Sequence, residues 1–226
     1  MSGTRAKLLE AAAHTVCEDG VAAASARTIA ARAQVNQALV FYHFGTVSEL
    51  LEAASQRRVD DSVAYYRERF ATARTLSELL AVGRDLHERE RAVGNVALMA
   101  QLMSGAQHDP VLARAARYAM TAWTAEIEAV VARVLTGSPL ADVTDLAGLA
   151  RAITAGFIGL ELLDGADPDA AVSALDALER LGVLVEVVND LGAVGRRAVR
   201  AKLRTRRPRA KTSRTTTPPE DAEGEP

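Results

Sequence analysis

The chain has 226 residues, of which 49% are hydrophobic and 25% are charged, enough to bury a sizeable core in one large or two smaller domains. Its net charge is −2, and its single cysteine, Cys17, excludes an internal disulfide and favours a buried structural thiol over a nucleophile. The sequence contains no signal-peptide pattern and no uncharged apolar run of about 18 residues, which predicts a cytoplasmic protein without a membrane span.

The charge is distributed unevenly along the chain. Residues 196–214 carry ten basic and no acidic side chains, whereas residues 1–195 carry 17 basic and 25 acidic ones. Overall charge therefore gives no argument for a nucleic-acid partner, and such an argument must rest on local residues. Residues 206–226 are rich in proline, threonine and charge, which predicts a disordered tail, basic and then acidic. The tail is a candidate for sequence-independent DNA affinity or for a role in solubility alone.

The first 70 residues predict four helices. Apolar residues three and four apart, with no proline before residue 110, favour helices throughout. Gly20 and Gly45 mark helix ends, while Ser25 and either Thr46 or Ser48 have the side chains of N-caps. The predicted spans are 4–19, 26–33, 37–43 and 47–70.

The rest of the chain predicts longer helices, so the fold class is all-α. Breaks fall at Gly94 and at residues 105–109, 136–139 and 164–168. The run 183–188 is β-branched enough for a strand, but it ends a long helical pattern, which favours helix. The predicted spans are 76–91, 96–104, 110–135, 143–163, 168–189 and 193–206.

The two short helices and the three-residue turn between them have the pattern of a helix-turn-helix unit. In such a unit the second short helix enters the major groove of DNA, where base edges present donors and acceptors. Gln37 is expected to contact a base edge, Ala38 and Phe41 a thymine methyl, and Tyr42 and His43 phosphates. Asn36 belongs to the same polar cluster. The alternative is a compact three-helix subdomain whose polar side chains only cap a core. The residues expected to pack these helices together are Ile29, Ala30, Ala33, Val35 and Val40.

Residues 5–54, and especially "RTIAARAQVNQALVFYHFGTVSELL", resemble the N-terminal domain of the tetracycline-repressor (TetR) family of bacterial transcriptional regulators. The shared features are an Ile-Ala pair, a Val step in the turn, an aromatic pair before His-Phe and a following Glu-Leu-Leu. Two departures are Gln34, where a glycine is usual in the turn, and Val47, where a phosphate-binding lysine is usual. The resemblance implies DNA contacts by Arg27, Thr28, Gln37, Ala38, Leu39, Phe41, Tyr42 and His43.

The resemblance also implies a homodimeric repressor that binds a palindromic DNA operator and is released by a small effector. It implies a helix-turn-helix domain at residues 1–46 and an effector-binding and dimerisation domain at 47–205, followed by the tail at 206–226. The last two long helices are expected to form the dimer interface, where Gly156 and Gly159 permit close approach. A helical interaction module that has lost DNA binding, or an enzyme, is the alternative function.

The middle helices suggest a mostly hydrophobic effector pocket. Residues 110–135 carry one apolar stripe, Leu112, Ala116, Ala119, Trp123, Ile127, Val130 and Val134, which also suits a filled core without a cavity. Gln101 is a further candidate for the polar end of an effector. The candidate pocket residues are Met99, Met103, Tyr118, Trp123, Phe157 and Glu161.

Catalytic, metal and cofactor sites are not predicted. His87 and Glu88 lie in "DLHERER", a charge run expected on a solvated helix face, and the sequence has no His-x-x-x-His pair. It also has no Gly-rich phosphate loop after a strand and no nucleophile elbow.

Overall fold

The computed structural model describes residues 2–141 and 145–205 of the chain, and in these residues every regular element is a helix. The all-α prediction is therefore confirmed, including the helical state of residues 183–188. The predicted tail at 206–226 lies outside the described residues. The elements are α1 (Ser2–Asp19), the short 3-10 helix η1 (Val21–Ala23), α2 (Ala26–Ala33), α3 (Ala38–Phe44), α4 (Val47–Thr72), α5 (Leu76–Ala92), α6 (Asn95–Gly105), α7 (Pro110–Val134), α8 (Leu146–Ala166), α9 (Pro168–Asn189) and α10 (Ala193–Thr205).

Side-chain caps explain where several helices begin. The hydroxyls of Ser25 and Thr46 accept hydrogen bonds from backbone N–H groups three residues later, as the sequence predicts. Thr75 forms a reciprocal capping box with Glu78 at the start of α5. The carboxylates of Asp109 and Asp167 accept hydrogen bonds from backbone N–H groups at the starts of α7 and α9, and each is followed directly by a proline.

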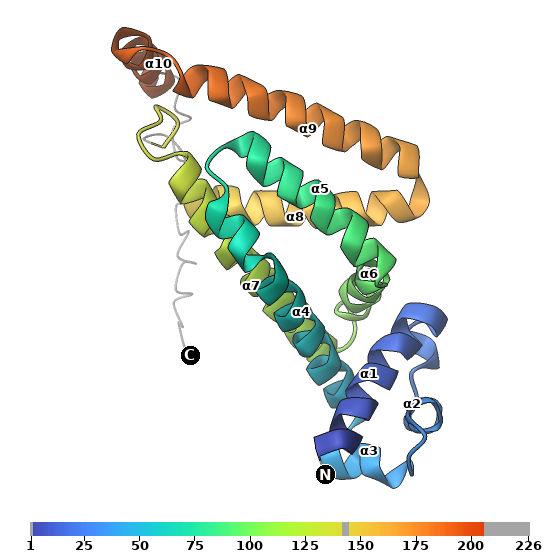
Figure 1. The fold of residues 1–226 in the computed structure, drawn as a ribbon. Helices are drawn as coiled ribbons and strands as arrows, with labels where there is room; N and C mark the ends of the chain where they lie inside the picture. Colours follow the sequence, from blue (N-terminus) through green and yellow to red (C-terminus); the bar gives the residue numbers. More distant parts are fainter. Residues whose placement is uncertain (1, 142–144, 206–226) are drawn as a thin grey trace, which may run out of the picture.

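The three N-terminal helices pack as one unit at one end of the molecule (Figure 1). Of the five residues expected to join them, four are buried and Val35 is partly buried against the same core. This core does not end at residue 46. Leu50 and Leu51 of α4, Leu98 of α6 and Leu112 of α7 belong to it, so the small unit rests directly on the larger one.

In the larger unit, α4 packs beside α7, and α8 packs against α7. Helix α9 packs against both α5 and α8 (Figure 1). The second core contains Tyr66 and Phe70 of α4, which pack with Leu86 of α5 and with residues of α7. The predicted α7 stripe is confirmed, since six of its seven members are buried and Trp123 is partly buried.

The prediction of a solvated "DLHERER" run is wrong for two of its six charged side chains, His87 and Glu90. His87 and Glu90 are only 7% and 6% exposed, although Glu88 is exposed as expected. His87 faces α8, and Glu90 faces α4 and the start of α6. Charged side chains are rarely buried unless they have partners, and the partners here come from distant segments that local sequence does not reveal.

Helix α8 is long and apolar enough to cross a membrane by length and composition alone, and it is the one such helix among the described residues. The helix also carries Arg151 and the buried acids Glu161 and Asp164, which contact His87 of α5. Much of its apolar surface lines a large, partly open cavity. The core helix of a soluble protein passes the same test, so the pattern is weak evidence for a membrane span.

Candidate nucleic-acid interface and effector cavity

The turn between α2 and α3 accommodates a side chain where a glycine is usual. Gln34 ends α2 in the left-handed conformation, with φ 56° and ψ 46°, and its side chain is exposed. This conformation costs an L-residue about 1–2 kcal/mol, which explains the usual preference for glycine. Asn36 then starts α3, because its Oδ1 accepts a hydrogen bond of 2.8 Å from the backbone N–H of Ala38. The side chain of Asn36 is therefore engaged in holding the turn.

Helix α3 has one buried and one exposed side. Val40 is completely buried against α1 and α2, whereas its neighbours Phe41 and Tyr42 are 50% and 70% exposed. Gln37 and Ala38 at the helix start are exposed as well. Two large aromatic side chains turned to solvent beside a fully buried valine are unusual for a helix that serves only as core. The exposed side of α3 therefore presents Gln37, Ala38, Phe41 and Tyr42 to solvent.

The remaining predicted DNA-contacting residues lie around this surface. Arg27 is exposed on α2, and Thr28 is half-buried with its hydroxyl 2.7 Å from that of Ser25. His43 is half-buried and packs its ring edge-on against Tyr42, with ring centroids 5.0 Å apart. Leu39 is half-buried and packs against the N-terminal core, so only part of its side chain is accessible.

Charged contacts hold both short helices against α1. Arg32 of α2 pairs with Glu18 and, at 2.8 Å, with Asp19. The side chain of Arg5 lies over the ring of Phe44 at 5.0 Å from its centroid. The Arg32 guanidinium also lowers the pKa of Glu18. Arg32 is a residue that sequence reasoning did not single out, and it links α2 to the end of α1.

A cavity of about 870 Å³ lies in the larger unit, between α4, α5, α6, α7, α8 and α9. Its size falls in the range of small-molecule sites, and its walls are almost entirely apolar. Four of the six candidate pocket residues line it: Met99, Trp123, Phe157 and Glu161. Trp123 also packs edge-on against Phe70, with ring centroids 6.3 Å apart, so it supports the wall as well as facing the space.

Tyr118 and Met103 do not line this cavity, contrary to expectation. Tyr118 is 39% exposed and its hydroxyl donates to Asp60 at 2.5 Å, a carboxylate contact that raises the pKa of the tyrosine. Tyr118 precedes Trp123 by five residues, which turns its side chain by about 140° around the helix axis. Gln101 also lies elsewhere, because its amide oxygen accepts a hydrogen bond from Val21 N–H at 3.4 Å.

The cavity has a polar end at Glu161 of α8, which contacts His87 of α5 outside the cavity lining. Glu161 is 7% exposed, and its Oε1 lies 2.9 Å from Nδ1 of His87 without the alignment of a hydrogen bond. Nε2 of His87 lies 3.6 Å from Asp164, which also pairs with Arg91 at 3.1 Å. Neither carboxylate oxygen of Glu161 has a hydrogen-bond partner, and burial raises the pKa of this group despite the nearby imidazole.

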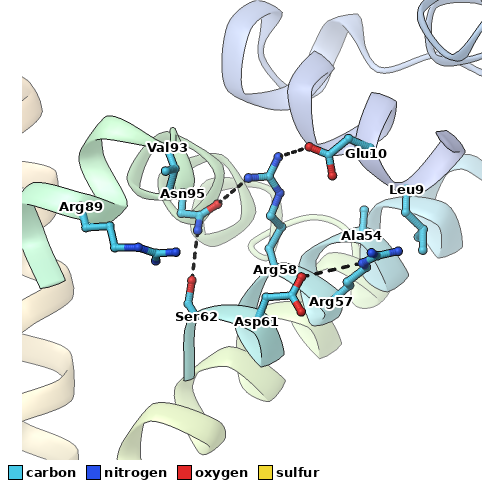
Figure 2. Close-up of a pocket in the computed structure, with 10 residues that line it drawn as sticks. All are labelled: Leu9, Glu10, Ala54, Arg57, Arg58, Asp61, Ser62, Arg89, Val93 and Asn95. Carbon is cyan, nitrogen blue, oxygen red and sulfur yellow. Dashed lines mark hydrogen bonds and ion pairs between the residues drawn. The ribbon is translucent and has the colours of Figure 1, made fainter. Parts of the chain in front are cut away.

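A second polar group connects the cavity wall to the N-terminal unit (Figure 2). Arg58 of α4 donates to Glu10 of α1 at 2.9 Å and to Oδ1 of Asn95 at 3.4 Å. Asn95 and Ser62 in turn donate to the buried carboxylate of Glu90, at 2.6 and 2.7 Å. Four of these residues line the large cavity, and all but Glu90 also line a cleft of about 200 Å³ that faces α1. A chain of polar contacts therefore runs from the cavity to α1.

Cys17 makes a further contact between α1 and the α5–α6 junction. Its Sγ donates to the backbone carbonyl of Gly94 at 3.1 Å, and burial raises the pKa of the thiol. A raised pKa disfavours the reactive thiolate, which fits the expected structural role. In the described part of the chain, no three His, Cys, Asp or Glu side chains lie close enough together to hold a metal ion.

Comparison with known proteins gives its clearest matches in the N-terminal unit. A family model described as bacterial regulatory proteins, tetR family, matches residues 8–54. A transcriptional repressor of the HTH type from Mycobacterium tuberculosis is 52% identical over 48 residues, which cover 21% of this chain and 26% of the relative. The regulator BetI of Paraburkholderia phytofirmans is 32% identical over 113 residues, which cover 49% of this chain and 58% of BetI. The chain matches less than two thirds of the length of either relative.

The fold extends the similarity beyond the N-terminal unit. A crystal structure from Rhodococcus sp., described as that of a TetR-family transcriptional regulator, superposes with a TM-score of 0.67. The superposition covers 83% of this chain and 99% of the other at 23% identity, so the likeness concerns the fold. Both the N-terminal unit and the larger helical unit therefore have the TetR-family architecture.

Proposed function

We propose that this chain is a cytoplasmic transcriptional repressor of the tetR family that binds a palindromic operator as a homodimer; the family match over residues 8–54 and the similar fold support this. A small effector that occupies the large cavity releases it from DNA. Residues 1–46 form the DNA-binding domain in this proposal, residues 47–205 the effector-binding and dimerisation domain, and 206–226 a tail.

The exposed side of α3 is the observation that carries this proposal. A helix that buries Val40 and exposes Phe41 and Tyr42 presents a protruding surface that suits the major groove. Gln37 reads a base edge, while Ala38 and Phe41 contact thymine methyl groups. Tyr42, His43, Arg27 and Thr28 contact the DNA backbone. Asn36 contributes by holding the start of α3, and the accessible part of Leu39 touches a phosphate.

The exposed surface of α8 and α9 supports a dimer. Large apolar side chains at half exposure or more are concentrated on α9, and one near the end of α8 is almost as exposed. Gly156 and Gly159 of α8 are exposed and a Cβ at either would meet nothing within 4 Å, although both also line the large cavity. Two-fold pairing of this surface would set the two α3 helices about 34–36 Å apart or slightly more. The exposed apolar residues are Leu162, Val172, Leu181, Val183, Leu184 and Val187.

The chain of polar contacts from Glu90 to Glu10 supports a mechanism by which an effector in the cavity releases the protein from DNA. Effector binding lowers operator affinity only to the extent that the effector prefers the DNA-incompetent arrangement. An occupant that displaces Asn95 or Arg58 from the cavity wall changes the contact with Glu10 on α1. The orientation of the N-terminal unit then depends on whether the cavity is occupied.

Selection of bound fragments from the source genome tests the function. The expected result is a short inverted repeat, bound with a steep dependence on salt because phosphates are neutralised. Tyr42→Phe serves as a matched comparison for Gln37→Ala, because it removes a backbone-directed hydroxyl and leaves the base-reading residue intact. A chain that enriches no sequence and binds DNA with no salt dependence would favour the helical interaction module instead.

A further inference from the structure

One charged group in the large cavity, Glu161, has no aligned hydrogen-bond donor, although the imidazole of His87 lies 2.9 Å from it. Arg58, Glu90 and Glu161 are the charged side chains that line the cavity. Arg58 binds Glu10 and Asn95, although its Nε has no acceptor, and Glu90 accepts hydrogen bonds from neighbouring side chains. Glu161 differs, since it is more than nine-tenths buried and both of its oxygens lack a hydrogen-bond donor. A buried carboxylate without donors is costly for the ligand-free protein.

The charges around Glu161 indicate which ligand charge suits this end of the cavity. Three buried carboxylates, Glu90, Asp164 and Glu161, lie on α5 and α8. Arg89 pairs with Glu90, and Arg91 pairs with Asp164. Glu161 has only the imidazole of His87 nearby, misaligned for a hydrogen bond and shared with Asp164. A carboxylate ligand would add a fourth negative charge here, and a purely apolar ligand would leave Glu161 without a donor.

An ammonium group supplies both the charge and the hydrogen-bond donors that Glu161 lacks. Beyond this end the cavity is lined by apolar side chains, among them Trp123 and Phe157, and its volume of about 870 Å³ leaves room for an extended apolar body. We infer that the cavity binds a lipophilic amine, whose ammonium group donates to the Glu161 carboxylate while its hydrocarbon or aryl body packs against the apolar walls. The inference rests on the proposed function in taking this cavity as the effector site, but binding itself requires no DNA.

Calorimetric titration of the full chain without DNA tests the inference with three probes of equal chain length at pH 7: n-decylamine, n-decanol and n-decanoate. Decylamine is expected to bind about tenfold or more tightly than decanol, and decanoate most weakly. In Glu161→Gln the affinity for decylamine falls about 10- to 100-fold, while that for decanol changes by less than about threefold. Glu128→Gln, which removes an exposed carboxylate of α7 outside the cavity, leaves all three affinities unchanged.

Equal binding of decylamine and decanol, preference for decanoate, or no binding of any probe overturns the inference. So does an unchanged decylamine affinity in a folded Glu161→Gln protein. If that variant fails to fold by circular dichroism, the order of the three probes with the wild-type chain decides alone. If the protein binds decylamine through Glu161 but selects no operator, the proposed function is refuted and this inference is supported. A chain that selects an operator but binds decanol as tightly as decylamine overturns this inference alone.

Discussion

The contact between Arg58 and Glu10 should transmit part of the effector response, and Arg58→Gln tests this directly. Arg58 lies in the cavity wall with its side chain 19% exposed, and its Nη2 donates to Glu10 at 2.9 Å across the boundary to α1. Glu10 is 60% exposed, so solvent screens the pair, and its contribution is expected to be about 0.5–1 kcal/mol. Loss of the pair should therefore change the effector-induced loss of operator affinity by about two- to fivefold.

The assay compares operator affinity with and without any ligand that weakens DNA binding in the wild-type chain. Arg57→Gln is the matched control, because Arg57 is the neighbouring arginine on α4 and pairs with Asp61 of the same helix at 3.8 Å. Arg58→Gln should alter the ratio of the two affinities, whereas Arg57→Gln should leave it within error. Equal effects of the two substitutions, or none from either, would refute the coupling role of Arg58.

Four further changes have defined outcomes. Gln37→Ala should lose about 1–3 kcal/mol of binding free energy on the operator and little on random DNA in a mobility-shift titration, and equal losses would contradict base reading. Trp123→Ala should alter the effector response far more than effector-free operator binding, and an unchanged response would remove Trp123 from the site. Gln34→Gly should relieve about 1–2 kcal/mol of strain from the left-handed conformation, while the added entropy of the unfolded chain should cost about 0.5–1 kcal/mol. Urea unfolding should therefore show a stability equal to or slightly above that of the wild type. A clear loss of stability would mean that the Gln34 side chain holds the turn. Burial raises the pKa of Glu161, so ionisation of this group costs stability as the pH rises above the ordinary glutamate pKa. Glu161→Gln should therefore melt higher than wild type at pH 7, with the difference shrinking toward pH 4, and a difference that grows on acidification would falsify that sign.

The sequence alone was sufficient for the local features of this chain. Helix starts at Ser25 and Thr46 and helix ends at Gly20 and Gly45 are determined by contacts within a few residues, which a sequence pattern contains. The division of α3 into a buried and an exposed side follows from its helical period, with Val40 directed inward. The family resemblance of residues 5–54 rests on the same short segment.

Only the tertiary structure decided which charges are buried and whether the larger unit encloses a cavity. The alternation of acids and bases in "DLHERER" predicts a solvated face, but α4, α6 and α8 supply partners that bury His87 and Glu90. As aromatic residues of α7, Tyr118 and Trp123 are equally plausible pocket residues by type, yet Tyr118 pairs with Asp60 on the surface and Trp123 faces the cavity. The cavity lies between six helices, and its Glu161 carboxylate has no aligned hydrogen-bond donor from any of them. Both depend on distances between segments far apart in the chain, which periodicity and capping do not determine.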